Sequence, residues 1–272
     1  MTLISKLTLA GVLSFTIPAY VATHAIAKEE NNTGESSVAG DSTAKGKSVI
    51  RGARGVKAGK AGKSENNSND SSSPLDDIEA SHLTFMREEE KLARDVYLTF
   101  ADWYPNQQVF DNIANKSEQT HTDTMRDKLE LYNLDDPNPE TNNLPDSLGD
   151  FTGEEWGWYF EEKFAQLTEK GANSELDALY VGAFIEELDM NDIADCPEVM
   201  TDDEETKYPD PCGLHYTDET GLINAYSFLI DGSERHLRAF VGQIEAVIGE
   251  CNYEAQYLSQ TDVDAILGRT CG

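Results

Sequence analysis

The stretch Met86-Arg-Glu-Glu-Glu-Lys-Leu-Ala-Arg-Asp-Val-Tyr97 places charged residues among apolar ones at helical spacing. It belongs to an apolar stripe that predicts a helix over about 81–104, formed by Leu83, Met86, Ala93, Val96, Tyr97 and Phe100. Glu89 falls at the centre of this stripe, and Glu90 falls at its edge on the same face as Tyr97. A buried charge is costly unless it is paired, protonated or bound to a metal ion. The stretch therefore points to a polar site inside a helical core, although a solvated charge cluster at a helix start would also explain three consecutive glutamates.

Four further segments have the same helical periodicity, at 109–132, 152–170, 174–194 and 218–249. Thr152, with Glu155 three residues later, predicts a capping box at the start of one of them. Residues 133–150 contain three prolines and Gly149, which predict a long crossover loop. Few segments show the alternation that is typical of strands. We therefore expect an all-α fold, an antiparallel four-helix bundle with a long crossover and an additional short helix.

Ionisable side chains also lie on the apolar faces of these later helices. Glu118 and His121 are three residues apart, so their side chains lie next to each other on the helix, where both can reach one ion. Asp189 falls in the middle of the apolar arc of its helix and Glu186 falls inside the edge, whereas Glu187 is expected to face solvent. A frayed helix end is the alternative explanation for the last carboxylate pair.

The last predicted helix carries His236 at the centre of its apolar face, three residues after Ser233. A single histidine in a core is often only a packing residue with satisfied hydrogen bonds. Together with the carboxylates of three other helices, however, His236 favours a shared metal site. Bundles that hold two metal ions use such a pattern, with Glu from some helices and Glu-x-x-His from others.

Three long phrases of the sequence resemble a known family. They are Met86–Tyr97, Val181-Gly-Ala-Phe-Ile-Glu-Glu-Leu-Asp189 and Gly232-Ser-Glu-Arg-His-Leu-Arg-Ala-Phe240. With them, the chain from about His82 to Glu245 resembles a bacterial family of uncharacterised ferritin-like domains (domain of unknown function 2202). The segment from Glu90 to Tyr97 and the Glu-x-x-His motif are also similar to the first two helices of rubrerythrins and ferritins.

The resemblance implies a ferritin-like fold with metal ligands at Glu90, Glu118, His121, Glu186 and His236, and a further carboxylate at Asp189. Glu89, Tyr97 and Ser233 would be neighbouring groups or alternative ligands. Because rubrerythrins carry Glu where this chain has Ser233, a single ion or a looser second site is an alternative to a symmetric two-iron centre. The mixed oxygen and nitrogen donors suit iron, with a di-iron centre possible, and manganese or zinc are alternatives.

The N-terminal part of the chain has the composition of an export signal followed by a linker. Lys6, the apolar stretch 7–25 and Ala25-Ile26-Ala27 predict a signal peptide over 1–27, with a membrane anchor as the alternative. Residues 28–74 are rich in Ser, Asn, Gly and Lys and lack aromatic residues, which predicts a disordered linker. The bundle would then occupy 75–250, without a membrane span once the signal is cleaved.

The four cysteines and the charge fit an exported domain. In an oxidising compartment, outside the cell or in the periplasm, four cysteines allow three connectivities. Of these we expect the local one, with Cys196 paired to Cys212 and Cys251 to Cys271, which would tie down a tail at 251–272. A zinc site is the alternative, but no CxxC occurs. The formal net charge of -30 argues against nucleic-acid binding and is compatible with a solvated surface or with attraction of cations.

Together these features predict an exported metal-binding protein. One hypothesis is a di-iron or manganese redox protein that acts on oxygen, peroxide or ferrous iron. The alternative is a non-catalytic metal-binding or cell-surface interaction module with a degenerate site. The expected partners are metal ions, and an assembly of identical copies is compatible with the sequence, which does not indicate its size.

Overall fold

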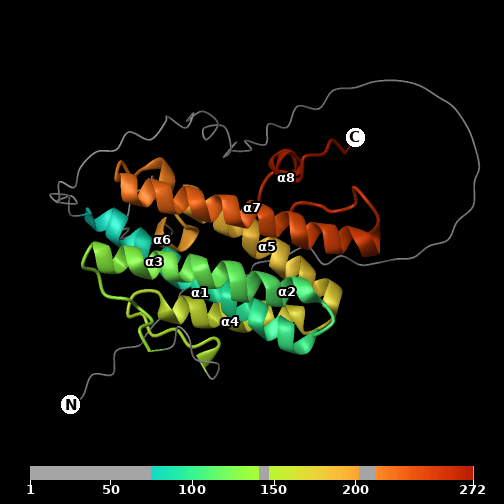
Figure 1. Cartoon of the computed structure of the whole chain (residues 1–272), viewed down its shortest axis with the longest axis horizontal. Coiled ribbons are helices and arrows are strands. Elements are labelled where there is room, and N and C mark those ends of the chain that lie inside the picture. The colour runs from blue at the N-terminus through green and yellow to red at the C-terminus, as the bar shows by residue number, and fades with distance from the viewer. Residues whose placement is uncertain (1–74, 141–146, 202–211, 272) are drawn as a thin grey trace, which may run out of the picture. The chain divides into compact units, whose positions relative to one another are not determined.

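The computed structural model describes residues 75–140, 147–201 and 212–271, and every regular element in these residues is a helix (Figure 1). The elements are α1 (Asp77–Trp103), α2 (Gln108–Ile113), a π-helix (Ala114–Glu118), α3 (Gln119–Leu131), α4 (Gly157–Gly171), α5 (Glu175–Ala194), α6 (Glu198–Thr201), a 3-10 turn (Gly213–His215), α7 (Thr220–Ile248) and α8 (Gln260–Leu267). The all-α expectation is confirmed. The predicted signal peptide (1–27) and linker (28–74) lie outside the described residues.

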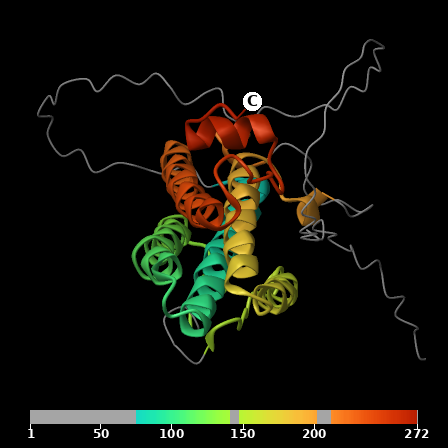
Figure 2. The same cartoon turned by 90° about the vertical axis from the view of Figure 1, so that its right-hand side faces the viewer.

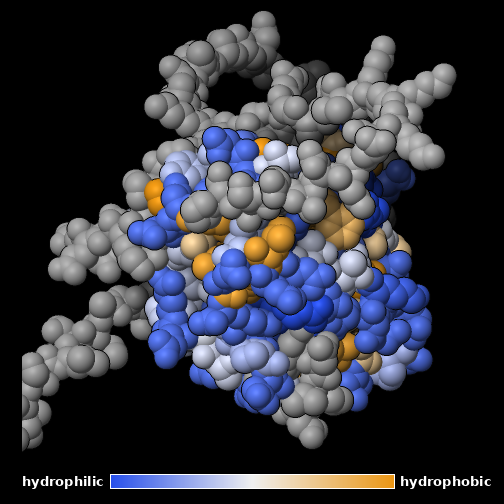
Figure 3. Space-filling view, turned by 60° about the vertical axis from the view of Figure 1, so that its left-hand side comes forward, coloured by the Kyte–Doolittle hydropathy of each residue, from blue (hydrophilic) through white to orange (hydrophobic). Residues whose placement is uncertain are grey.

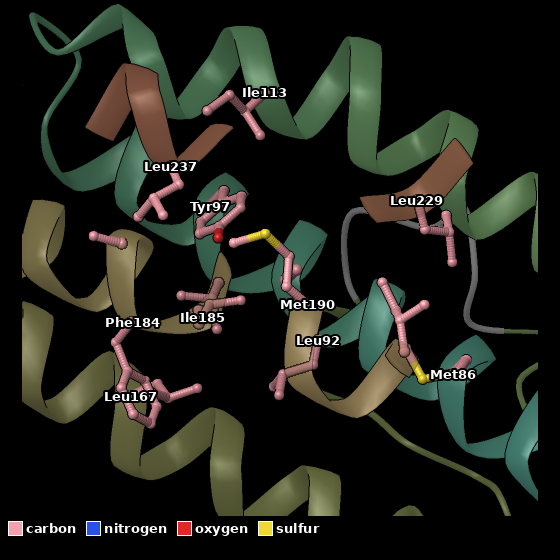
Figure 4. Close-up of a cluster of buried hydrophobic side chains, with 14 of the residues drawn as sticks. Met86, Leu92, Tyr97, Ile113, Leu167, Phe184, Ile185, Met190, Leu229 and Leu237 are labelled. Carbon is pink, nitrogen blue, oxygen red and sulfur yellow. The ribbon is translucent and has the colours of Figure 1, made fainter. Parts of the chain in front are cut away.

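Four long helices enclose the core. α1 packs against α3 and α5, and α7 packs against α5 and α3, so each helix contacts two of the others (Figure 2). α4 lies outside this ring, in contact with α1 and α5. Figure 4 shows apolar side chains of one buried cluster, among them Tyr97 of α1, Ile185 of α5 and Leu237 of α7. In the part of the chain that is described, no helix is both long and apolar enough to cross a membrane.

Close contact between α5 and α7 depends on a glycine. A Cβ atom at Gly182 would lie 2.6 Å from the ring of Phe240, so only a residue without a side chain allows this approach. The ring of Phe240 in turn lies 5.1 Å from that of Tyr97, between centroids. Full burial of such a side chain contributes about 1.5–3 kcal/mol, and the aromatic contacts therefore hold the three helices in register.

The charged face of α1 is buried as well, because the crossover covers it. The ammonium of Lys91 donates to Asp95 at 2.5 Å and lies 4.4 Å from the centre of the Phe151 ring. The guanidinium of Arg94 and the backbone N–H of Gly149 also donate to Asp95. Ion pairs within α1 thus neutralise its buried charges, and crossover residues that follow the undescribed part of this loop add a hydrogen bond and an aromatic contact.

Two helix boundaries, the starts of α1 and α4, differ from those expected. α1 begins earlier, at Asp77, because the side chain of Asp76 and that of Glu79 form a capping box. α4 begins at Gly157 without a side-chain cap, because the Thr152 hydroxyl instead donates to the carbonyl oxygen of Pro137, 2.6 Å away. Short polar side chains often bind the backbone of a loop in this way rather than capping a helix.

The C-terminal segment is better ordered than the expected tail. It contains α8, whose first turn is capped by the side chain of Ser259, and it lies beside α7. Disulfides join Cys196 to Cys212 and Cys251 to Cys271, the pairing expected from the sequence. The face of the molecule in Figure 3 is mostly hydrophilic with scattered apolar groups, as the large negative charge suggests.

Candidate metal centre

Glu118 lies at the middle of a buried cluster of carboxylates and imidazoles. Its Oε2 is 3.2 Å from Nδ1 of His121, and its Oε1 is 2.7 Å from Nδ1 of His236. Glu90 approaches His121 at 3.2 Å, and Glu186 approaches His236 at 3.3 Å. Two groups of potential ligands therefore share Glu118, one with Glu90 and His121 and the other with Glu186 and His236. We call these five residues the core cluster.

The core cluster is assembled from all four core helices and is sealed from solvent. Glu90 comes from α1, Glu186 from α5 and His236 from α7, and each of the five residues is at most 5% exposed. Glu118 is the last residue of the π-helix, which continues directly into α3. A π-turn inserts one extra residue into a helix and is frequent at functional sites. Here it brings Ser117 as well as Glu118 to the core, where the Ser117 hydroxyl lies 2.7 Å from Nε2 of His236.

Charges within the core cluster strongly perturb its pKa values. Burial raises the pKa of Glu90 to about 7, although the nearby His121 opposes this effect. Burial would also lower the pKa of His236, but Glu186 and Glu118 outweigh burial and raise it to about 10. For Glu118, the two imidazolium groups outweigh burial and hold the carboxyl pKa well below its usual range. Without a bound cation, the cluster is thus held together by protonated imidazoles between carboxylates.

The same residues fit a metal ion. Oε1 of Glu90 and Nε2 of His121 are buried without a hydrogen-bond partner in the described part of the chain. The cluster offers both imidazole Nδ1 atoms next to carboxylate oxygens, a donor set that suits iron, manganese or zinc. Gly232 leaves room for the imidazole of His121, since a Cβ atom there would lie 2.3 Å from its Cε1. A cation would replace the protons on the imidazoles, as metal binding at histidine requires.

Neighbouring hydroxyl groups hold the remaining carboxylates. Tyr97 donates to Oε1 of Glu186 at 2.6 Å. Ser233 donates to Oδ2 of Asp189 at 2.5 Å, while the other oxygen, Oδ1, is buried without a partner among the described residues. Asp189 lies outside both ligand groups, but its charge interacts with those of Glu90 and Glu186.

Glu89 is buried like Glu90 but does not join either ligand group. Its carboxyl group interacts with those of Asp192 and Asp189. Asp192 and Ser117 were not singled out from the sequence. Asp192 is three residues after Asp189 on the same helix, a spacing that could have revealed it. Helical spacing also places Ser117 on the apolar face with His121, but it gives no sign of the π-turn.

The expectation for Glu187 is wrong, because this side chain is fully buried. Its Oε1 accepts from the hydroxyl of Tyr253 at 2.6 Å. Its Oε2 accepts from the backbone N–H groups of Gln256, Tyr257 and Leu258, at 2.9, 2.7 and 2.9 Å. We call Glu187 and these four residues the C-terminal clasp. The side chain is buried because the ordered C-terminal segment covers the face of α5 that helical spacing alone assigns to solvent.

Comparisons with a family model and with a curated protein point to the same family. The family model described as "Uncharacterized protein domain (DUF2202)" matches residues 79–209 and 212–270. The chain is 40% identical over 194 residues to the uncharacterized protein MJ0754 of Methanocaldococcus jannaschii, which covers 71% of this chain and 89% of the relative.

A solved structure agrees with this relationship. The crystal structure of the hypothetical protein MJ0754 from Methanococcus jannaschii DSM 2661 is similar with a TM-score of 0.58 and 37% sequence identity. The match covers 73% of this chain and 96% of that chain. The family match spans all four core helices, and with them every residue of the core cluster. The chain therefore belongs to the family of the uncharacterized protein domain DUF2202.

Proposed function

We propose that this chain is an exported ferritin-like protein that binds one or two metal ions at the core cluster. The observation that carries the proposal is the position of Glu118, whose two oxygens each face a different imidazole. A carboxylate in this position can serve two ions at once, with Glu90 and His121 on one side and Glu186 and His236 on the other. Ferritin-like bundles use the same kinds of residues on the inner faces of four helices.

Asp189 is the proposed further carboxylate of this centre. Ferritin-like sites draw a Glu-x-x-His pair from each of two helices, but α7 offers only Ser233 three residues before His236. The hydroxyl of Ser233 instead holds Asp189, which comes from α5 and keeps one unpartnered oxygen within the described residues. A carboxylate from a neighbouring helix would thereby take the place of the missing one.

Iron held by these carboxylates and imidazoles with an open position would supply chemistry with oxygen or peroxide, and ferrous iron itself would then be a substrate. The protein residues prepare the site for such chemistry. Tyr97 fixes the orientation of Glu186, and Ser117 does the same for His236. Burial of all five ligands keeps bulk water out of the site, which strengthens their interactions with a cation.

A second function, a non-catalytic exported metal-binding or cell-surface module, is favoured by one observation. Ser233 replaces a carboxylate, and its hydrogen bond to Asp189 already occupies one oxygen of that side chain. Such a centre would bind a cation without leaving positions open for a reaction. Export itself is supported in both cases by the two disulfides, which form in oxidising compartments such as the periplasm or the exterior of the cell.

Metal analysis of the untagged full-length chain tests the proposal. We expect about one to two ions of iron, manganese or zinc per chain, by analogy with ferritin-like bundles, and a rise in the melting temperature when metal is added. An oxygen-consumption assay with added ferrous iron then separates a redox enzyme from a non-catalytic module. If no reconstitution with iron, manganese or zinc produces a bound ion, the core cluster is only a structural network of ion pairs.

A further inference from the structure

One exposed aromatic side chain contacts the core cluster. Phe228 of α7 is 39% exposed, and its ring lies 5.3 Å from the imidazole of His121, between centroids, at an angle of 79°. His121 itself is only 1% exposed. Single apolar residues at a surface are ordinary, but in the described part of the chain no other exposed large apolar side chain has a ring contact with the core cluster. The ring of Phe228 therefore contacts solvent and a proposed metal ligand at the same time.

The two imidazoles of the core cluster are held in place by different means. Nε2 of His236 lies 2.7 Å from the hydroxyl of Ser117. Nε2 of His121 is buried and has no hydrogen-bond partner among the described residues. A histidine that binds a metal ion usually donates its other ring N–H to a polar group, which fixes the orientation of the ring. Since His121 has no such group, packing must fix its orientation instead.

Three neighbours pack against the imidazole of His121. Phe228 and Gly232 are four residues apart on α7 and therefore share one face of this helix. A Cβ atom at Gly232 would lie 2.4 Å from Nε2 of His121, so the imidazole lies directly against the backbone of α7. The ring of His236 is stacked on it, with 5.4 Å between the centroids. Of these three neighbours, only Phe228 is exposed.

The carboxylate side of the core cluster has a thicker cover than the imidazole side. Glu90 and Glu186 come from α1 and α5, and α4 packs against both of these helices. His121 and His236 lie instead where α3 meets α7, and Ser117, which contacts His236, is only half-buried. The imidazole side is therefore the side of the centre nearest to solvent, and next to His121 its cover is a single aromatic ring.

We propose that Phe228 is a positioning residue of the metal centre, which holds the imidazole of His121 in place and shields an ion on that side from water. The inference rests on the proposed function, because a positioned ligand requires an ion. The apolar shell of a metal site controls the access of solvent, and exclusion of water strengthens the interactions of the ion with its ligands. Phe228 therefore governs how long an ion stays beside His121, whereas an ion beside His236 depends on Ser117.

Release of Co²⁺ from the full-length chain tests this role. The loaded protein is mixed with an excess of chelator in a stopped-flow instrument, and the visible absorbance of the bound ion is followed. Phe228→Ala is expected to release Co²⁺ from the His121 side about tenfold faster than the wild type, the effect of losing an outer-shell partner. Phe228→Leu restores an apolar cover and is expected to recover most of the wild-type rate. Leu131→Ala is the matched control, because Leu131 is an exposed apolar residue at the end of α3, and its release rate is expected to match the wild type.

The absorption bands of the bound Co²⁺ provide a readout that a loss of stability alone would not move, because they report the geometry of its ligands. We expect these bands to shift in Phe228→Ala, since the imidazole of His121 can then turn and water can enter, and to stay unchanged in Leu131→Ala. Wild-type release and unchanged bands in Phe228→Ala would overturn the role of Phe228 and leave the centre intact. Equally fast release from Leu131→Ala would also overturn it, as a general loss of stability. A wild-type chain that binds no Co²⁺ would instead remove the proposed centre itself.

Discussion

Glu186 and Glu187 are neighbours on α5, and both are buried, yet they belong to two different kinds of site. Glu187 accepts one hydroxyl and three backbone N–H groups in the C-terminal clasp. Glu186 accepts one hydroxyl from Tyr97 and faces the imidazole of His236 in the core cluster. The carboxylate of Glu187 thus has its hydrogen bonds satisfied by the chain. Glu186 belongs instead to a cluster whose negative charges are balanced by protons on its imidazoles.

The difference shows that burial of a charge does not by itself indicate a ligand site. What separates the two sites is the supply of donors. The clasp has a protein donor for each interaction of its carboxylate, so a cation there would have to displace them. The core cluster leaves Glu90 Oε1 and His121 Nε2 without partners in the described residues, and it gathers three carboxylates around two imidazoles.

The largest effect is expected for Glu118→Ala, which tests whether the core cluster is the metal site. Both ligand groups lose their shared member, so metal affinity should fall by more than the roughly 10–100-fold that changes to outer-shell partners cause. Metal content after dialysis, measured by mass spectrometry, should drop from one or two ions per chain to almost none. Unchanged metal content in this variant would place the ion elsewhere.

For Glu187→Ala in the C-terminal clasp we expect the opposite result, a loss of stability without a loss of metal. Removal of the carboxylate leaves three N–H groups and the Tyr253 hydroxyl without their acceptor. Because a buried polar group without a partner costs about 1–3 kcal/mol, we expect a loss on the order of 4 kcal/mol after partial hydration. Urea denaturation measures this loss, and metal content should remain that of the wild type. Glu187→Gln retains an acceptor oxygen and should lose less of the free energy of unfolding. A loss of metal in Glu187→Ala would show that the clasp and the core cluster are not separate sites.

His82 is a buried imidazole outside the core cluster, and both of its ring nitrogens have hydrogen-bond partners. Its Nε2 donates to the carbonyl oxygen of Asp192 at 2.8 Å, and its Nδ1 accepts from the hydroxyl of Tyr226 at 2.9 Å. Burial lowers its pKa from 6.5 to about 4, whereas the carboxylates around His236 raise the pKa of that imidazole. His82 is therefore neutral in the folded state and resists protonation.

Between pH 6.5 and pH 4 the unfolded chain gains a proton at His82 that the folded chain does not. The free energy of unfolding is therefore not reduced by His82 above pH 6.5. It falls progressively as the pH is lowered to about 4, by about 3 kcal/mol in total. Glu88, whose pKa burial raises to about 7, acts in the opposite sense over the same range. The measurement is therefore the difference in unfolding free energy between wild type and His82→Gln as a function of pH. A difference that does not change with pH would show that His82 titrates normally.

The smallest effect is expected within the core cluster, from Ser117→Ala. The hydroxyl of Ser117 holds His236 through Nε2, and loss of such an outer-shell partner should weaken binding roughly tenfold. Only the ion position that includes His236 should be affected, since His121 has no contact with this hydroxyl among the described hydrogen bonds. Calorimetric titration should therefore resolve one weakened and one unchanged position. Equal weakening at both positions would argue for a single shared ion.

Much of this arrangement could be anticipated from residue spacing. The helical periodicity around Tyr97 predicts α1, and the three-residue interval between Glu118 and His121 predicts that their side chains meet, as they do at 3.2 Å. Spacing succeeds here because residues three apart on a helix always share a face. It failed for Glu187 because a helical pattern shows which face is apolar, not which further segment will cover the opposite face.

The sequence alone therefore determined the all-α class and the helices that carry the carboxylates and imidazoles, and it favoured the local disulfide pairing among three connectivities. These features follow from local periodicity and from cysteine spacing, which do not require knowledge of distant contacts. Only the tertiary structure decided that Glu118 lies between two imidazoles, that a π-turn brings Ser117 next to His236, and that the segment before α8 covers Glu187. Each of these depends on the rotation and close approach of helices far apart in the chain, which are set by packing of side chains rather than by the residues of any one segment.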